Sequence, residues 1–308
     1  MEALPIIAVR WALYGDLGLL FGMPLFGLYA LRGRERETEP AERAVYAALA
    51  IAGFLLSALG FALTAAAMSG TTLAHLDPAI LAMLLRQTSL GWAWLGRMVA
   101  LALALGVSAW RPIPAGARFV ALAACGGFAV STLAWFGHGA ASEGAPGYIH
   151  LGADIVHLLA ASAWIGALAM LLVLVGSGVS SSHRRVMAAH DALASFSTIG
   201  TMLVGLIIAT GVINGAFLVG ADAITLLGRS LYGRLLLAKL MAFAAMLGCA
   251  ALNRFRLTPR LAEASGQPAI ADALAALRRS IAIETVLAIL VLALVGWLGT
   301  LEPPLPAS

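Results

Sequence analysis

The stretch that decides the fold is LGADIVHLLAASAWIGALAMLLVLV, residues 151–175. A helix of about 20 apolar residues crosses the hydrocarbon core of a bilayer, because each residue adds about 1.5 Å to its length. Only Asp154 and His157 are ionisable within this stretch, and both lie near its beginning. It therefore predicts a membrane-spanning helix with two polar side chains toward one end.

The whole chain is also strongly apolar. Its 308 residues are 61% hydrophobic and 11% charged, and the mean hydropathy is +0.95. A soluble domain carries about 25% charged residues, so a soluble fold, a disordered tail and a nucleic-acid-binding domain are excluded. The apolar residues form unbroken runs, whereas the strands of a membrane β-barrel alternate. We therefore predict an all-α, polytopic membrane helical bundle, with residues 1–308 forming a single transmembrane domain.

Eight apolar runs are long enough to span a bilayer. A shorter apolar segment, 77–88, has a proline in its first turn and is interpreted as an amphipathic helix at the membrane surface. The N-terminal sequence MEALPII lacks the basic residues of a signal peptide, so we interpret the first run as a retained span. The predicted spans are 5–31, 44–68, 89–110, 118–137, 151–175, 194–219, 231–252 and 280–301.

The basic residues predict the orientation of this bundle. Thirteen of the nineteen fall in connections at one end, and loops rich in arginine face the cytoplasm. With eight spans, both termini are then expected on the periplasmic side. Two cysteines within apolar runs, Cys125 and Cys249, indicate no disulfide framework.

The candidate site surrounds the fifth span. His150, Asp154, His157 and Trp164 follow one another at spacings of 4, 3 and 7, which place them on one helical face. His138 closes the fourth span within a GHG sequence. Imidazole binds copper, zinc, iron and nickel, and a carboxylate one turn before His157 can ligate the metal or orient the ring. We predict a metal or haem site here. Structural hydrogen bonds between helices are the alternative, and His150 also fits a solvated loop residue.

Other ionisable residues also lie inside predicted spans. Arg10, Asp16, Arg97, Lys239 and Glu284 each need a partner, because an unpaired charge in a membrane is costly. One expectation is a structural network in which Asp16 neutralises Arg10 or Arg97. Arg10 also fits a side chain that extends to the outer membrane interface.

Methionines and glycines in the spans have two interpretations as well. Met68 and Met98 fit either thioether ligands for Cu(I) or ordinary packing. Gly205, Gly211 and Gly215 are expected at close contacts between helices.

The fifth span resembles the signature of the CopD/PcoD family of copper-resistance membrane proteins, D-x-x-H-L-L-A-A-x-x-W-x-G-x-L. The FGHGAA segment is similar to the family's G-H-A, with glycine at the third place. The resemblance is strongest over a core of approximately 118–262. Matching positions are Asp154, His157, Leu158, Leu159, Ala160, Ala161, Trp164, Gly166, Leu168, Phe196, Ser197, Thr210, Gly211, Asn214, Tyr232, Gly233, Leu235, Leu236, Lys239, Asn253, Arg254, Leu257 and Pro259.

The resemblance implies a multi-pass protein of the bacterial inner membrane that binds copper, as Cu(I) or Cu(II), and is not an enzyme. The family is described as moving copper inward after receiving it from a periplasmic CopC-type carrier. Expected ligands at the outer face are His138, His150, Asp154 and His157, with supporting roles for Arg97, Trp164, Asn214, Tyr232, Lys239, Met68 and Met98. A nucleotide-binding GxxxxGK[ST] motif does not occur in the sequence, so transport is expected to be passive or gradient-driven.

Two other functions fit the same residues. Paired histidines on adjacent spans ligate haem in membrane electron-transfer proteins. A copper-delivery factor for oxidase assembly would bind copper without transporting it. A haem absorption band distinguishes the first alternative, and copper uptake into vesicles distinguishes the second.

Overall fold

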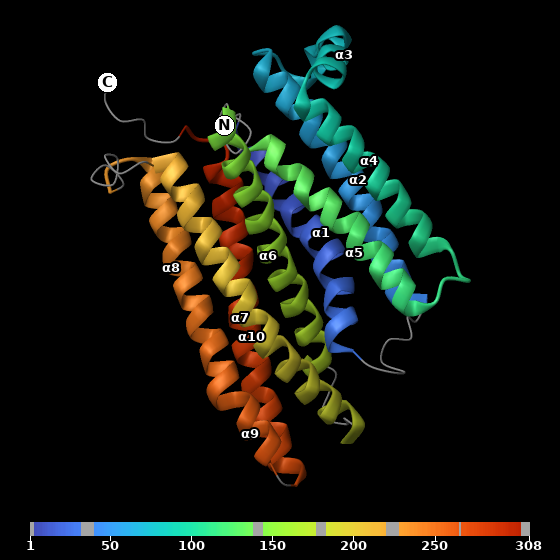
Figure 1. Cartoon of the computed structure of the whole chain (residues 1–308), viewed down its shortest axis with the longest axis vertical. Helices are drawn as coiled ribbons and strands as arrows, with labels where there is room; N and C mark the ends of the chain where they lie inside the picture. Colours follow the sequence, from blue (N-terminus) through green and yellow to red (C-terminus); the bar gives the residue numbers. More distant parts are fainter. Residues whose placement is uncertain are drawn as a thin grey trace.

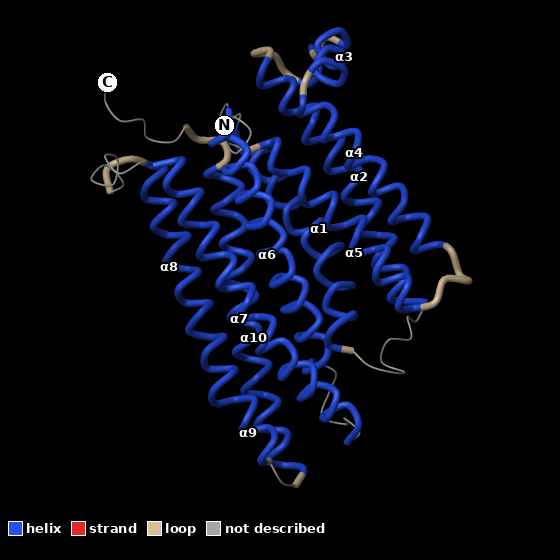
Figure 2. Tube along the Cα trace, viewed as in Figure 1, coloured by secondary structure: helices blue, strands red, loops and turns tan. Residues whose placement is uncertain are grey.

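The computed structural model describes residues 3–31, 40–137, 144–176, 183–219, 228–264 and 266–302. In this part of the chain every regular element is helical (Figure 2). Eight helices are long and apolar enough to cross a membrane, which confirms the predicted number of spans. The elements are α1 (Ala3–Ala30), α2 (Pro40–Met68), η2 (Leu73–His75), α3 (Pro78–Gln87), α4 (Ser89–Ala109), α5 (Ala115–Ser131), η3 (Thr132–Phe136), α6 (Gly144–Gly176), α7 (His183–Val219), α8 (Leu231–Leu252), η6 (Asn253–Leu257), α9 (Thr258–Glu263) and α10 (Gln267–Leu298).

Several helices extend beyond the apolar runs that predicted them. α10 begins at Gln267, whereas its apolar run begins near residue 280, and α7 begins at His183. The seventh span continues from α8 through the π-helical segment η6 into α9. Backbone hydrogen bonds continue a helix into water, whereas hydropathy marks only the part that fits the hydrocarbon.

α1 and α6 form the centre of the bundle. On one side α2 and α5 pack on α1, and α4 packs on α2 and α5 (Figure 1). On the other side α7 and α10 pack on α6, and α8 packs on α10. α1 and α6 cross at a direct contact between Gly22 and Gly166. A Cβ added to Gly166 would lie 2.1 Å from the carbonyl carbon of Gly22. This contact brings the two halves of the bundle together.

α3 is a short helix at one end of α2 and α4 (Figure 1). It begins as the sequence predicts, because the Asp77 side chain accepts a hydrogen bond from the Ala79 N–H at 2.8 Å and Pro78 occupies the first turn. Leu84 is buried against Phe61, and much of the helix surface is exposed. These features agree with an amphipathic helix at the bundle's end.

The two ends of the bundle differ in charge. α1 begins and α10 ends at the same end, where Arg10 donates a hydrogen bond to the carbonyl oxygen of Gly299 at 2.7 Å (Figure 1). The opposite end, called here the arginine-rich end, carries α9 and the α4–α5 connection. Its described arginines are Arg43, Arg111, Arg118, Arg254, Arg256, Arg260, Arg278 and Arg279.

Candidate functional site

Three polar or aromatic pairs join α6 to α7, and together they form what we call the α6–α7 ladder. The His150 ring stacks on Phe217, with centroids 4.8 Å apart and planes 3° from parallel. The Asn214 side-chain N–H donates to Asp154 Oδ1 at 3.3 Å. His157 Nδ1 lies 3.0 Å from the Thr210 hydroxyl. The helices run antiparallel, so the three predicted residues on α6 all meet α7.

Thr210 determines which nitrogen of His157 carries the proton. Its hydroxyl donates to the carbonyl oxygen of Leu206 at 2.6 Å, so its oxygen has only lone pairs left for the ring. His157 Nδ1–H therefore donates to Thr210, and Nε2 keeps its lone pair. A metal-binding histidine is commonly fixed in this way, with one nitrogen hydrogen-bonded and the other available to the ion.

Asp154 lies between three helices. Its Oδ1 is held by Asn214, and its Oδ2 faces Gly137, where an added Cβ would be 3.8 Å away. Lys239 of α8 is near enough for its ammonium to act electrostatically on both Asp154 and His157. A carboxylate, an imidazole and a cation thus share one part of the membrane interior.

The fourth predicted ligand, His138, lies outside the described residues. It directly follows Gly137 in the chain. Within the described ranges, no three side chains of the His, Cys, Asp or Glu type gather closely enough to hold a metal ion. The four-residue metal set therefore stays a prediction.

Two arginines, the half-buried Arg10 and the buried Arg97, contact the chain just before His138. Arg10 donates to the carbonyl oxygen of Phe136 at 2.6 Å. Arg97 donates to the Thr132 hydroxyl at 2.8 Å and lies 4.6 Å from the centre of the Phe136 ring. The expected pairing of Asp16 with either arginine is wrong: among the described residues no ion pair joins Asp16 to Arg10 or Arg97, and Asp16 Oδ2 is buried without a hydrogen-bond partner. Carbonyl, hydroxyl and ring partners contact the two cations instead.

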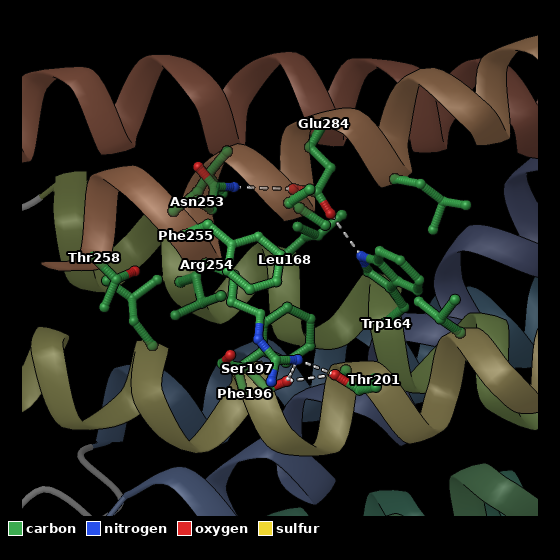
Figure 3. Close-up of a pocket in the computed structure, with 18 residues that line it drawn as sticks. Trp164, Leu168, Phe196, Ser197, Thr201, Asn253, Arg254, Phe255, Thr258 and Glu284 are labelled. Atoms are coloured by element: carbon green, nitrogen blue, oxygen red, sulfur yellow. Dashed lines mark hydrogen bonds between the residues drawn. The ribbon is translucent and has the colours of Figure 1, made fainter.

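Trp164 belongs to a second polar group, although it shares the helix of His157. Its indole N–H donates to Glu284 Oε1 at 2.8 Å, and the Asn253 amide donates to Oε2 at 3.2 Å (Figure 3). Trp164 is seven residues from His157, about 10 Å along α6. A carboxylate inside a span was the sequence signal for this group, but its partners are distant in the chain.

The remaining predicted residues lie in other surroundings. Met98 packs in the apolar cluster of α1, α4 and α5, and Met68 is 65% exposed at the end of α2. Tyr232 packs with Leu235 and Leu298 in a small cluster of its own.

Fold and site together define a polytopic membrane protein with a histidine–carboxylate ladder inside its bundle. Residues 1–148 match the family model described as "Copper resistance protein D-like, N-terminal domain", and residues 190–298 match "Copper resistance protein D". No solved structure matches the chain.

Two curated relatives cover nearly the whole chain. Copper resistance protein D of Pseudomonas syringae pv. tomato is 40% identical over 309 residues, 98% of each chain. Inner membrane protein YebZ of Escherichia coli (strain K12) is 28% identical over 265 residues, 85% of this chain and 88% of the relative. The chain belongs to the copper resistance protein D family, and it is a multi-pass protein of the inner membrane.

Proposed function

We propose that this protein carries copper inward across the bacterial inner membrane. In this proposal a periplasmic CopC-type carrier delivers the ion to the end of the bundle where α1 begins and α10 ends. His138, His150, Asp154 and His157 receive it there. Membership of the copper resistance protein D family supports the cargo, and the α6–α7 ladder supports the site.

The observation that carries the proposal is the hydrogen bond between His157 and Thr210. It leaves Nε2 of the half-buried His157 with a lone pair and no proton. One turn away, Asn214 orients the Asp154 carboxylate. Imidazole and carboxylate are ligands that copper accepts, and they lie beside the chain leading to His138.

Lys239 suits a site that must also release its ion. With no copper bound, electrostatic attraction across the helix interface favours the charged forms of Lys239 and Asp154. An arriving cation takes over this role and is repelled by the ammonium. Transport requires binding that is favourable enough for entry and weak enough for exit.

The test uses the full-length protein, purified and reconstituted into vesicles, with copper binding and copper uptake measured on the same preparation. Replacing His157 by alanine should lower both by about tenfold or more, because a proposed copper ligand is removed. His190→Ala is the matched control, since His190 lies near the beginning of α7 and pairs with its neighbour Asp191.

Each alternative function gives its own result. Unchanged binding and uptake in His157→Ala would overturn the proposed site. Copper binding by the wild type without uptake would indicate a delivery factor. A haem absorption band in copper-free wild-type protein would indicate electron transfer.

A further inference from the structure

A second polar group lies deep in the bundle, at Glu284 of α10. Its side chain is 1% exposed, and both carboxyl oxygens accept hydrogen bonds from neutral donors, Trp164 and Asn253. Across the described ranges no basic side chain forms an ion pair with it. Burying an ionised carboxylate without a countercharge is costly, even when hydrogen bonds are present. The group is therefore suited to taking up a proton or another cation.

A cavity of about 200 Å³ adjoins this carboxyl group. Its walls come from α6, α7, α10 and the α8–η6–α9 helix, and they are mostly apolar. Toward the arginine-rich end the wall is formed by Arg254, an exposed residue that donates to the Ser197 carbonyl and the Thr201 hydroxyl (Figure 3). The cavity thus extends from the buried Glu284 to a surface residue, and it has room for several water molecules.

The partners of Glu284 can satisfy both of its protonation states. The Trp164 indole only donates, so it holds Oε1 of either form. The Asn253 amide donates to Oε2 of the ionised form, while its own Oδ1 is buried without a partner in the described structure. Turning that amide by half a rotation presents Oδ1 to Oε2, where it accepts the O–H of the protonated acid.

The backbone at Asn253 is unusual as well. Asn253–Leu257 is a π-helical segment between α8 and α9. Such segments are rare and occur frequently at functional sites. Here the segment places Asn253 against the Glu284 carboxyl group and Arg254 against α7, so it supplies polar contacts at two parts of the cavity lining.

We propose that Glu284 is a proton-exchange site, at which an entering copper ion displaces a proton. The inference rests on the proposed transport of copper. In the exchange the O–H bond of Glu284 breaks, the electron pair stays on the carboxylate, and the proton leaves through the cavity toward water at Arg254. The copper ion replaces the positive charge of the proton, and no electrons are transferred. When copper leaves, the carboxylate takes a proton from the same water.

Few charged or titratable groups surround this exchange. Exposed Arg278 and Arg279 lie five to six residues earlier on α10. Cys249 of α8 is near enough to be influenced by the carboxylate. In the described structure, α1, α6, α7 and η6 add Tyr29, Trp164, Ser197, Thr201 and Arg254.

Infrared difference spectroscopy on the purified full-length protein tests the exchange directly. Adding copper should remove a carboxylic acid carbonyl band and produce carboxylate bands. Glu284→Gln should lack this response, because an amide cannot release the proton, yet it retains an acceptor for Trp164. Glu284→Asp should keep the response, and Glu263→Gln, an exposed carboxyl on α9, is the matched control.

A second measurement follows protons in reconstituted vesicles with a trapped pH-sensitive dye. Copper uptake by the wild type should be accompanied by proton flow, and Glu284→Gln should reduce this flow by about tenfold or more. Full copper uptake with full proton flow in Glu284→Gln overturns the inference while transport stands. A copper-free wild-type band that titrates with pH, together with no copper uptake, refutes transport and leaves Glu284 as an acid–base site. A band that responds neither to copper nor to pH overturns the exchange.

Discussion

Thr210 controls what the histidine on the neighbouring helix can bind. A neutral imidazole has one N–H and one lone pair, and the nitrogen that keeps the lone pair is set by the partner of the other. Thr210 uses its only hydrogen on the Leu206 carbonyl and accepts from Nδ1. His157 is therefore held with the Nε2 lone pair available to a cation. The side chain that orients the ring, Thr210, is itself uncharged.

Replacing Thr210 by valine should weaken copper binding by about ten- to a hundredfold. Without the hydrogen bond from Nδ1 to Thr210, the His157 ring can rotate and the proton can move to Nε2. Valine has nearly the same shape, so the packing of α6 on α7 should survive. Equilibrium binding of copper to the purified variant measures the effect, and thermal unfolding verifies the fold.

Thr64→Val is the matched control for this change. Thr64 also donates to a carbonyl four residues earlier, that of Gly60, but it lies on α2 away from the ladder. Equal copper affinities in Thr210→Val and the wild type would show that Thr210 does not orient a ligand.

The residues on α6 were predictable, and their partners were not. Spacings of 4 and 3 place His150, Asp154 and His157 on one face because helix geometry is local. The partners of His157 and Asp154 lie 53 and 60 residues away, and Glu284 lies 120 residues from Trp164. Contacts at such separations depend on how whole helices pack, so hydropathy and spacing contain no information about them.

At the scale of helices, the crossing of α1 and α6 depends on glycine. A Cβ on Gly22 would lie 2.3 Å from the Ser162 carbonyl oxygen, and Gly166 is equally restricted by Gly22. The sequence suggested close contacts at Gly205, Gly211 and Gly215 instead. In the described structure nothing lies within 4 Å of a Cβ at Gly205 or Gly215, and Gly211 faces the His157 ring. A glycine in the sequence shows only that another helix could approach closely at that position. Whether a helix does so depends on how the helices pack.

Gly166→Ala should therefore destabilise the protein by at least about 2 kcal/mol, since the added methyl group meets backbone atoms that cannot rotate away. In an open helix position the same change stabilises, by about 0.5–1 kcal/mol, because alanine is the better helix former. Unfolding of the purified protein in detergent measures both effects.

Gly152 provides the open position on the same helix. It is exposed, and a Cβ there has no neighbour within 4 Å in the described structure. Gly152→Ala should leave stability unchanged or raise it. Equal free energies of unfolding for Gly166→Ala and Gly152→Ala would show that α1 and α6 are packed less closely than the structure indicates.

The sequence predicted the number and location of the spanning helices well, but it predicted the residues at which they begin and end less well. Hydropathy located all eight spans because the requirement for about 20 apolar residues is a property of the bilayer. The same rule cannot locate the ends of α7, α9 and α10, which extend past the apolar runs. The π-helical turn at Asn253 also has no hydropathy signal, although it positions a polar side chain inside the bundle.

For the whole molecule, the ladder and the arginines lie toward opposite ends of the bundle. His150, in the second turn of α6, begins the ladder near the end where α1 starts, and α9 carries Arg260 at the other end (Figure 1). Arginine-rich connections remain cytoplasmic during insertion. The ladder should then open toward the periplasm, as a site that receives copper from a periplasmic carrier requires.

Single cysteines test this orientation. In a background with Cys125 and Cys249 replaced by alanine, Tyr148→Cys and Glu263→Cys place one thiol at each end. Tyr148 is 78% exposed at the start of α6, and Glu263 is exposed at the end of α9. A membrane-impermeant maleimide should label Tyr148→Cys in intact spheroplasts and Glu263→Cys only after permeabilisation. The reverse pattern would place the ladder in the cytoplasm and refute import through it, and equal labelling of both before permeabilisation would contradict a single orientation.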